Sequence, residues 1–222
     1  MPSKKPLLPL EPVPDLPDVF RARRGASAMA AIRLRDGRLA LYSPVKDLSH
    51  EAVERISSMG GAAVLIAPSH FHHLGQREYL EAFPGASIYA PLAAHPRLKK
   101  QTGLDFLDVM ELVRALPEAV RFHVPPGLKA EELWLEVSSG DNVGLQVCDA
   151  FGAPAKEDGL PVEHAAVRGA FRTMCLKDAA VFREWAQDYF GTIELTHLLP
   201  CHGARVSGPG LSAHLSQTLE SL

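Results

Sequence analysis

The sequence has few cysteines, and the three it contains lie far apart. Cys148, Cys175 and Cys201 form no Cys-x-x-Cys pair. A disulfide framework is built from an even set of cysteines, and a thiolate zinc ribbon from closely spaced pairs. We therefore expect neither of them, and we expect the protein in a reducing cytoplasm.

Long apolar runs and an excess of basic residues are also missing. No apolar stretch reaches the length that spans a bilayer, and the basic start Met1–Lys5 is followed by prolines rather than by the apolar core of a secretory signal. The 23 basic and 26 acidic residues give a net charge of -3, whereas nucleic-acid-binding domains usually carry a basic excess. We expect no membrane and no nucleic-acid partner. The expected partner is a small-molecule substrate. The sequence reveals neither the identity of this substrate nor the oligomeric state.

The chain is long enough for one domain with a substantial core. It has 222 residues, of which 46% are apolar and 22% charged, close to the average of globular proteins. Residues 1–25 are proline-rich and predict an extended N-terminal arm, and residues 26–222 predict a single domain.

The first half of this domain alternates strands and helices. Residues 28–43 predict a hairpin with its turn at Asp36-Gly37, and Ser49 is a suitable cap for a helix ending before Gly60-Gly61. The continuous apolar run 62–67 is typical of a strand covered on both faces, and a helix at 76–83 and a strand at 87–90 follow. This order predicts a layered α/β domain.

The second half predicts strands packed with amphipathic helices. Residues 104–116 have helical spacing, and strands are expected at 120–124, 133–137, 143–148 and 195–200, with helices at 178–189 and 211–222. Residues 151–173 show no clear periodicity and predict either a lid over a site or a long connection. Together the elements predict two sheets with helices outside them.

Histidines gather directly after the buried strand at 62–67, in the segment Ser69-His70-Phe71-His72-His73. Ligands in α/β proteins collect at the carboxyl ends of strands. On an extended loop His70 and His72 point the same way, so both imidazoles could bind one metal ion. Two further strand ends carry Asp149 and His202, and Gly203 allows a sharp turn after the histidine. These three strand ends predict one convergent site.

In its motifs the chain resembles the metallo-β-lactamase-fold hydrolases, and more closely a divergent branch with an incomplete metal motif. The family's first motif reads Thr-His-x-His-x-Asp-His, and its place is taken here by Ser69-His70-Phe71-His72-His73-Leu74-Gly75. The middle Pro-Gly-His-Thr turn corresponds to Pro126-Gly127-Leu128-Lys129. The family's bridging aspartate matches Asp149, and its last histidine matches His202. The resemblance extends over about residues 26–210 and implies an αβ/βα four-layer sandwich.

Three of the seven ligands expected from the family motif are absent. Leu74, Gly75 and Leu128 stand where an aspartate and two histidines are expected, which leaves His70, His72, Asp149 and His202 as metal ligands. This set cannot complete a two-metal centre. The resemblance then implies at most one divalent ion, zinc ahead of iron or manganese, or no metal at all. His73 or His123 are the candidates to replace a lost ligand.

Three hypotheses follow. The first is a mononuclear metal-dependent hydrolase of an ester, thioester or phosphoester, with Asp149 and His73 as catalytic residues and His73 as general base in place of the lost aspartate. The second is a metal-free, inactive descendant that serves as a binding or scaffold module, with apolar residues such as Leu74 packed into the emptied pocket. The third is a metal-free acid–base enzyme that uses His72 or His73 with Asp149 as orienting residue.

Overall fold

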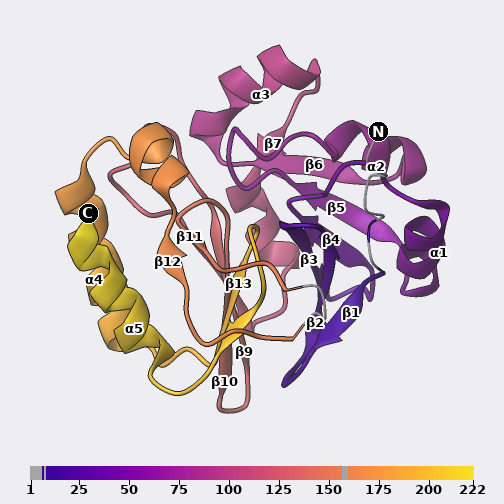
Figure 1. Ribbon diagram of the computed structural model, residues 1–222. Coiled ribbons are helices and arrows are strands. Elements are labelled where there is room, and N and C mark those ends of the chain that lie inside the picture. Colours follow the sequence, from indigo (N-terminus) through magenta and orange to yellow (C-terminus); the bar gives the residue numbers. More distant parts are fainter. Residues whose placement is uncertain (1–6, 8, 157–159) are drawn as a thin grey trace, which may run out of the picture.

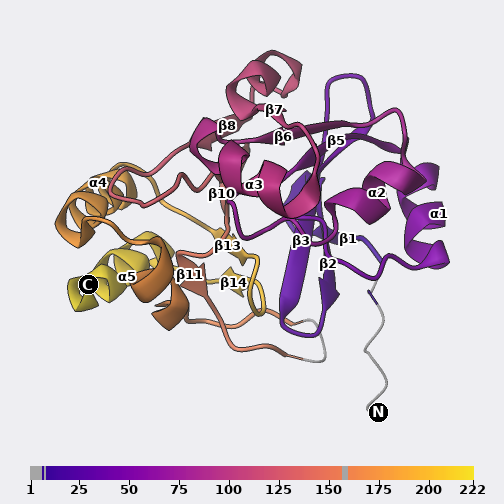
Figure 2. The same cartoon turned by 90° about the horizontal axis from the view of Figure 1, so that it is seen from above.

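Two β-sheets face one another at the centre of the molecule, and helices cover the outer face of each (Figure 1). The structure is a computed structural model that describes residues 7, 9–156 and 160–222. The same layers are seen from above in Figure 2, with α1 and α2 at one side and α4 and α5 at the other. The predicted two-sheet sandwich with outer helices is confirmed.

The larger sheet contains seven strands in chain order, from an antiparallel first half to a parallel second half. Its strands are β1 (Glu11–Val13), β2 (Leu16–Arg24), β3 (Ser27–Arg33), β4 (Leu39–Tyr42), β5 (Ala62–Ile66), β6 (Ser87–Ala90) and β7 (Leu107–Asp108). All five residues of β5 are buried, as the continuous apolar run predicts for a strand covered on both faces.

The smaller sheet has five strands in the order β14-β13-β10-β9-β8. They are β8 (Val120–His123), β9 (Trp134–Ser139), β10 (Asn142–Val147), β13 (His197–Pro200) and β14 (Val206–Ser207). β10 and β13 run parallel, with Val147 opposite Pro200, so their carboxyl ends lie at the same edge. A separate two-stranded ladder joins β11 (Phe151–Gly152) to β12 (Ala166–Val167).

Helices pack on both outer faces, and one helix layer belongs to each sheet. The larger sheet is covered by α1 (His50–Ser58), α2 (Gln76–Ala82) and α3 (His95–Thr102), through residues such as Ile56, Tyr79 and Leu98. The smaller sheet is covered by α4 (Ala179–Thr192) and α5 (Leu211–Thr218), through Phe182 and Leu215. In the described ranges, no helix combines the length and the apolar character needed to cross a membrane.

The N-terminal segment differs from the predicted arm. Residues 11–24 are part of the larger sheet as β1 and β2, and Leu10, Val13 and Leu16 are buried. Prolines fit here because β1 is an edge strand, where a missing N–H removes no ladder bond, and because Pro14 stands in the turn between the strands. Residues 1–6 and 8 of the predicted arm lie outside the described residues.

Two other segments differ from the predicted elements. Residues 104–116 contain the short strand β7 and the 3-10 helix η2 (Val109–Ala115) instead of one α-helix, with Asp108 capping η2. Residues 151–173 contain β11, β12 and the start of the π-helical turn η3 (Phe171–Cys175). The chain closes with η4 (Leu219–Ser221), and the 3-10 turn η1 (Leu92–Ala94) precedes α3.

Candidate metal centre

Three side chains from three separate strand ends meet between the two sheets. His72 stands in the loop between β5 and α2, Asp149 follows β10, and His202 follows β13. Their ligand atoms all lie within 4.8 Å of one another. We call His72, Asp149 and His202 the outer set.

The distances within the outer set are short and nearly equal. Nε2 of His202 lies 3.2 Å from Oδ1 of Asp149 and 3.3 Å from Nε2 of His72, and the latter atom lies 3.4 Å from Oδ2 of Asp149. Ligands at about 2.0–2.1 Å from one tetrahedral ion are separated from each other by about 3.3 Å. The spacing of the three donors therefore fits one divalent ion.

The ring of His72 is held by a hydroxyl on its other side. Oγ of Ser43, directly after β4, lies 2.7 Å from Nδ1 of His72. Ser43 is buried and has a positive φ of 55°. A hydrogen bond at Nδ1 fixes the orientation of the ring and leaves Nε2 to face the other two donors, as outer partners of metal-bound histidines do.

Asp149 forms an ion pair with an arginine in addition to its contacts with the two histidines. Nη1 of Arg168 donates to Oδ1 of Asp149 at 2.5 Å. The short β11–β12 ladder brings Arg168 there, since its backbone N–H bonds the carbonyl of Ala150 and its aliphatic part lies against Gly152. Sequence reasoning missed Arg168 because it stands in the stretch without periodicity.

A buried carboxylate supports the loop that carries Asp149. Oε1 of Glu132 accepts hydrogen bonds from the backbone N–H groups of Cys148 and Ala150, and from the Trp134 indole. Burial, together with the charge of Asp149, raises the pKa of Glu132 to about 7 despite the hydrogen bond from Trp134. Glu132 therefore fixes the backbone on both sides of Asp149. The sequence shows it only as one of an acidic pair.

The charges of the outer set are strongly coupled. Burial works against the charged form of His72, but its hydrogen bonds to Asp149 and Cys201 raise its pKa to about 10. Burial likewise opposes the charge of Asp149, yet the two histidines hold the pKa of this carboxyl well below its usual range. In the metal-free protein, an ion pair of His72 and Asp149 takes the place that a cation would occupy.

The other two histidines of the cluster lie outside the outer set. The backbone turns at this point, because the N–H of His72 bonds the carbonyl of Ser69, so the extended loop that would aim His70 and His72 the same way is absent. The His70 ring packs against Phe71, and Nδ1 of His73 lies 3.3 Å from the carbonyl of His70. Burial and the nearby charge of Arg97 lower the pKa of His70, and burial also lowers that of His73.

The positions of the missing family ligands are occupied in three different ways. Leu74 is 62% exposed and does not fill the pocket, contrary to the expectation of an inactive packed site. Gly75 lies so close to Pro44 that a Cβ atom would approach its carbonyl oxygen to 2.3 Å. Leu128 packs at the edge of the α4 and α5 layer. His123, the candidate replacement, is instead bonded to Glu136 at 2.8 Å.

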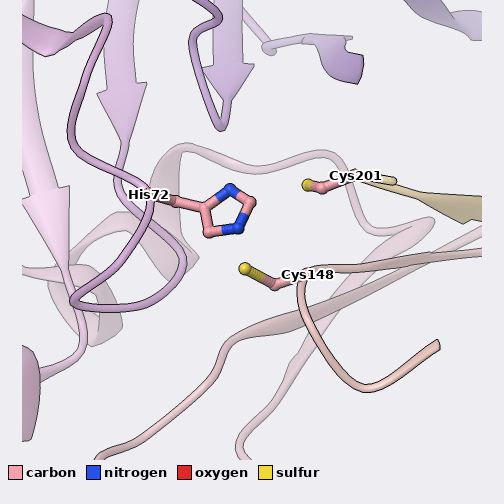
Figure 3. Close-up of side chains that lie close together, drawn as sticks. All are labelled: His72, Cys148 and Cys201. Carbon is pink, nitrogen blue, oxygen red and sulfur yellow. The ribbon is translucent and has the colours of Figure 1, made fainter. Parts of the chain in front are cut away.

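Two buried thiols lie beside His72, in the apolar core between the two sheets. Cys148 and Cys201 directly precede Asp149 and His202, and their sulfur atoms lie within 4.8 Å of each other and of a His72 ring nitrogen. Figure 3 shows the His72 ring facing both sulfurs. We call His72, Cys148 and Cys201 the inner set. In the sequence these two residues stand out only as two of three widely spaced cysteines.

A cleft of about 160 Å³ opens beside the outer set. Its wall includes His72 and His202 from the site, together with the apolar side chains of Phe71 and Leu74, and Lys46. The cleft gives a small molecule access to the outer set.

The sequence matches no protein-family model and no curated protein. Solved structures are similar over almost the whole chain. The DIM-1 metallo-β-lactamase has a TM-score of 0.66 at 13% identity, covering 99% of each chain. The FIM-1 metallo-β-lactamase from Pseudomonas aeruginosa, in its mono-zinc form, has a TM-score of 0.67 at 13% identity, covering 99% of this chain and 97% of its own. A diflavin flavoprotein fragment from Nostoc sp. PCC 7120 has a TM-score of 0.67 at 17% identity. The match covers 98% of this chain and 95% of that fragment.

Proposed function

We propose that this protein, which has the metallo-β-lactamase fold, is a mononuclear metal-dependent hydrolase of an ester, thioester or phosphoester. One observation carries the proposal: three donors from separate strand ends, His72, Asp149 and His202, are spaced at 3.2–3.4 Å. The fold alone does not determine function, because this architecture hosts several chemistries. The mono-zinc form of FIM-1 is consistent with a one-ion centre in this fold.

The outer set would hold the ion, and zinc matches its donors best, with iron or manganese as the alternatives. A divalent ion in such a site lowers the pKa of bound water and polarises the bond to be broken. Ser43 keeps Nε2 of His72 directed at the site. The cleft beside Phe71 and Leu74 accepts the apolar part of a substrate.

Two further residues have roles in this proposal. The cation of Arg168, beside Asp149, is placed to stabilise negative charge that develops on a reacting carbonyl or phosphoryl group. Burial lowers the pKa of His73, which favours the neutral imidazole, the form that can accept a proton. His73 thus remains our candidate for the general base.

The first test is metal content. We expect close to one equivalent of zinc, iron or manganese in protein purified without chelator, measured by mass spectrometry. Loss of the ion is expected in His72→Ala, Asp149→Asn and His202→Ala. His50→Ala is the matched control, because this histidine is exposed on α1, where it pairs with Glu54. A protein that neither contains nor takes up any of these ions would rule the proposal out.

The second test is turnover of chromogenic esters, thioesters and phosphoesters by the metal-loaded protein. Activity should be lost on addition of a chelator and return with the ion. Turnover that persists in chelator would instead support the metal-free acid–base mechanism with His72 or His73.

The second candidate function is a non-catalytic binding module. The ion pair of Arg168 and Asp149 favours it, since a guanidinium already neutralises the single carboxylate of the outer set. Absence of metal uptake together with unchanged stability of His72→Ala would support this alternative.

A further inference from the structure

Each of two neighbouring strand ends carries two successive metal-ligand side chains. Cys148-Asp149 follows β10 and Cys201-His202 follows β13. The strands are parallel neighbours with Val147 opposite Pro200, and the N–H of Cys201 bonds the carbonyl of Val147. The two thiols are therefore held side by side, one residue deeper than Asp149 and His202.

We propose that the inner set, His72 with Cys148 and Cys201, is a second metal site that binds a thiophilic ion, Zn²⁺ or Cu⁺. It shares His72 with the outer set but does not depend on hydrolytic activity. Thiolate and imidazole are the donors these ions prefer. The three donor atoms already lie within 4.8 Å of one another and converge in Figure 3.

The inner set is more deeply buried than the outer set, although Cys201 and His72 also line the cleft. Cys148 is 0% exposed and Cys201 is 1% exposed, whereas the side chain of His202 is 28% exposed. Closed sites with sulfur ligands are typical of structural metal binding, and open sites with a free position are typical of catalysis. The inner set therefore fits a tightly held ion rather than a reactive one.

The two thiols belong to the apolar core between the sheets, yet each also has polar side chains within contact distance. Sγ of Cys148 lies 3.5 Å from Oγ of Ser69 and 3.6 Å from Oδ2 of Asp149, and Nε2 of Gln146 lies 3.5 Å from Sγ of Cys201. Inert cysteines pack as small apolar residues. The carboxyl of Asp149 is close enough to Cys148 to serve as a fourth ligand for Zn²⁺.

An unpartnered carboxylate oxygen provides a separate indication of a cation. Glu132 is 2% exposed, and its Oε2 has no hydrogen-bond partner within the described part of the chain. A carboxylate oxygen of Glu132 lies within 4.8 Å of ligand atoms of Cys148 and Asp149. Buried polar atoms without a partner are rare and call for an explanation, such as an ion. A cation at Cys148 would supply the missing interaction.

Both sets need His72, so we expect one ion to exclude the other. An ion in the inner set would engage the histidine on which the outer set depends. Cu⁺ would fill the inner set alone, because soft thiolates select it, whereas Zn²⁺ suits the donors of both sets.

Cobalt provides the test, because Co²⁺ bound to thiolate has a strong near-ultraviolet charge-transfer absorption that it lacks with nitrogen and oxygen ligands alone. We expect the reduced, metal-free full-length protein to develop this absorption on titration with Co²⁺, and Zn²⁺ to abolish it. The absorption should be lost in Cys148→Ala, Cys201→Ala and His72→Ala. It should persist in His202→Ala, which disrupts only the outer set, and in Cys175→Ala, whose thiol belongs to neither set.

Cobalt binding without the thiolate absorption would overturn the inner site and leave the outer set intact. Mass analysis showing a disulfide between Cys148 and Cys201 in the protein as isolated would overturn it as well. If the alanine variants fail to fold, as judged by circular dichroism, the wild-type titration decides alone, with Cu⁺ uptake competed by a chelator as the second measurement. Loss of the absorption in Cys175→Ala but not in Cys148→Ala would also contradict the proposal.

Discussion

Nη1 of Arg168 lies 2.5 Å from Oδ1 of Asp149, the same oxygen that lies 3.2 Å from Nε2 of His202. A cation of the protein itself thus shares the only carboxylate of the outer set. The guanidinium repels an incoming metal ion and competes with it for this oxygen. We therefore expect Arg168 to weaken metal binding at the proposed outer set.

Replacing Arg168 with Gln should strengthen zinc binding by about tenfold, which corresponds to about 1.4 kcal/mol for this partly exposed ion pair. The measurement is a zinc titration with a competing chromogenic chelator. Arg172→Gln is the matched control, because this arginine is exposed on the same segment and bonds Ser221. Equal affinities for wild type and Arg168→Gln would show that the ion pair does not oppose metal binding.

The positions of the three outer-set residues could be predicted from the sequence, because each of these residues follows a short apolar run. The runs before His72, Asp149 and His202 are buried strands, and strand ends gather at one edge of a sheet. The four-layer fold was predicted from the order of several motifs along the chain. No single motif would have been enough for that prediction.

The sequence-based predictions that were wrong or incomplete depend on contacts that hydrophobic periodicity does not reveal. Some of these contacts are single local hydrogen bonds, and others join residues far apart in the chain. His70 could not be separated from His72 because the turn depends on one backbone hydrogen bond from His72 to Ser69. Ser43 and Arg168 reach the site from 29 and 19 residues away along the chain. Strand β2 was missed because it contains Pro17, but this residue lies outside the pairing registers of β2 with β1 and with β3, so its missing N–H removes no ladder bond.

Replacing Ser43 with Ala should weaken zinc binding by about tenfold or more, since outer partners that orient a ligand histidine contribute about 10–100-fold to metal affinity. The Nδ1 atom of His72 loses its partner at 2.7 Å, and the ring becomes free to rotate. The same zinc titration measures the effect. Ser58→Ala, at an exposed site on α1, should leave the affinity unchanged. An unchanged zinc affinity in Ser43→Ala would show that this hydroxyl does not orient the His72 ring.

The stability of the metal-free protein should depend on pH through His72 and Asp149. The pKa of His72 is raised from about 6.5 to about 10, so its contribution is complete below pH 6.5 and is lost as the pH rises through 10. The pKa of Asp149 is lowered, so its contribution is complete above about pH 4 and is lost at lower pH.

We therefore expect the free energy of unfolding to be highest between about pH 4 and pH 6.5 and to fall above it by at most about 1.4 kcal/mol per pH unit. Urea unfolding in chelator at pH 5, 7 and 9 measures this. His72→Gln should flatten the alkaline side, while His50→Gln should not. A stability that rises from pH 7 to pH 9 would contradict the ion pair.

Gly75 should tolerate no side chain, including the histidine that the resembled motif has at this position. A Cβ atom at this position would lie 2.3 Å from the carbonyl oxygen of Pro44, which is backbone and cannot move aside cheaply. Gly75→Ala should therefore lower the free energy of unfolding by about 1–3 kcal/mol, the usual cost of overpacking. Gly75→His should cost at least as much and bind no second zinc ion.

Urea unfolding compares these variants with Gly85→Ala, a control with open space around the Cβ position. The loop that carries Gly75 also carries His72, so a shift that relieves the clash with Pro44 should move the ligand away from Asp149. Gly75→Ala is thus expected to weaken zinc binding as well as stability, whereas Gly85→Ala changes neither. A fully stable Gly75→His that binds two equivalents of zinc would show that the loop accepts the complete family motif.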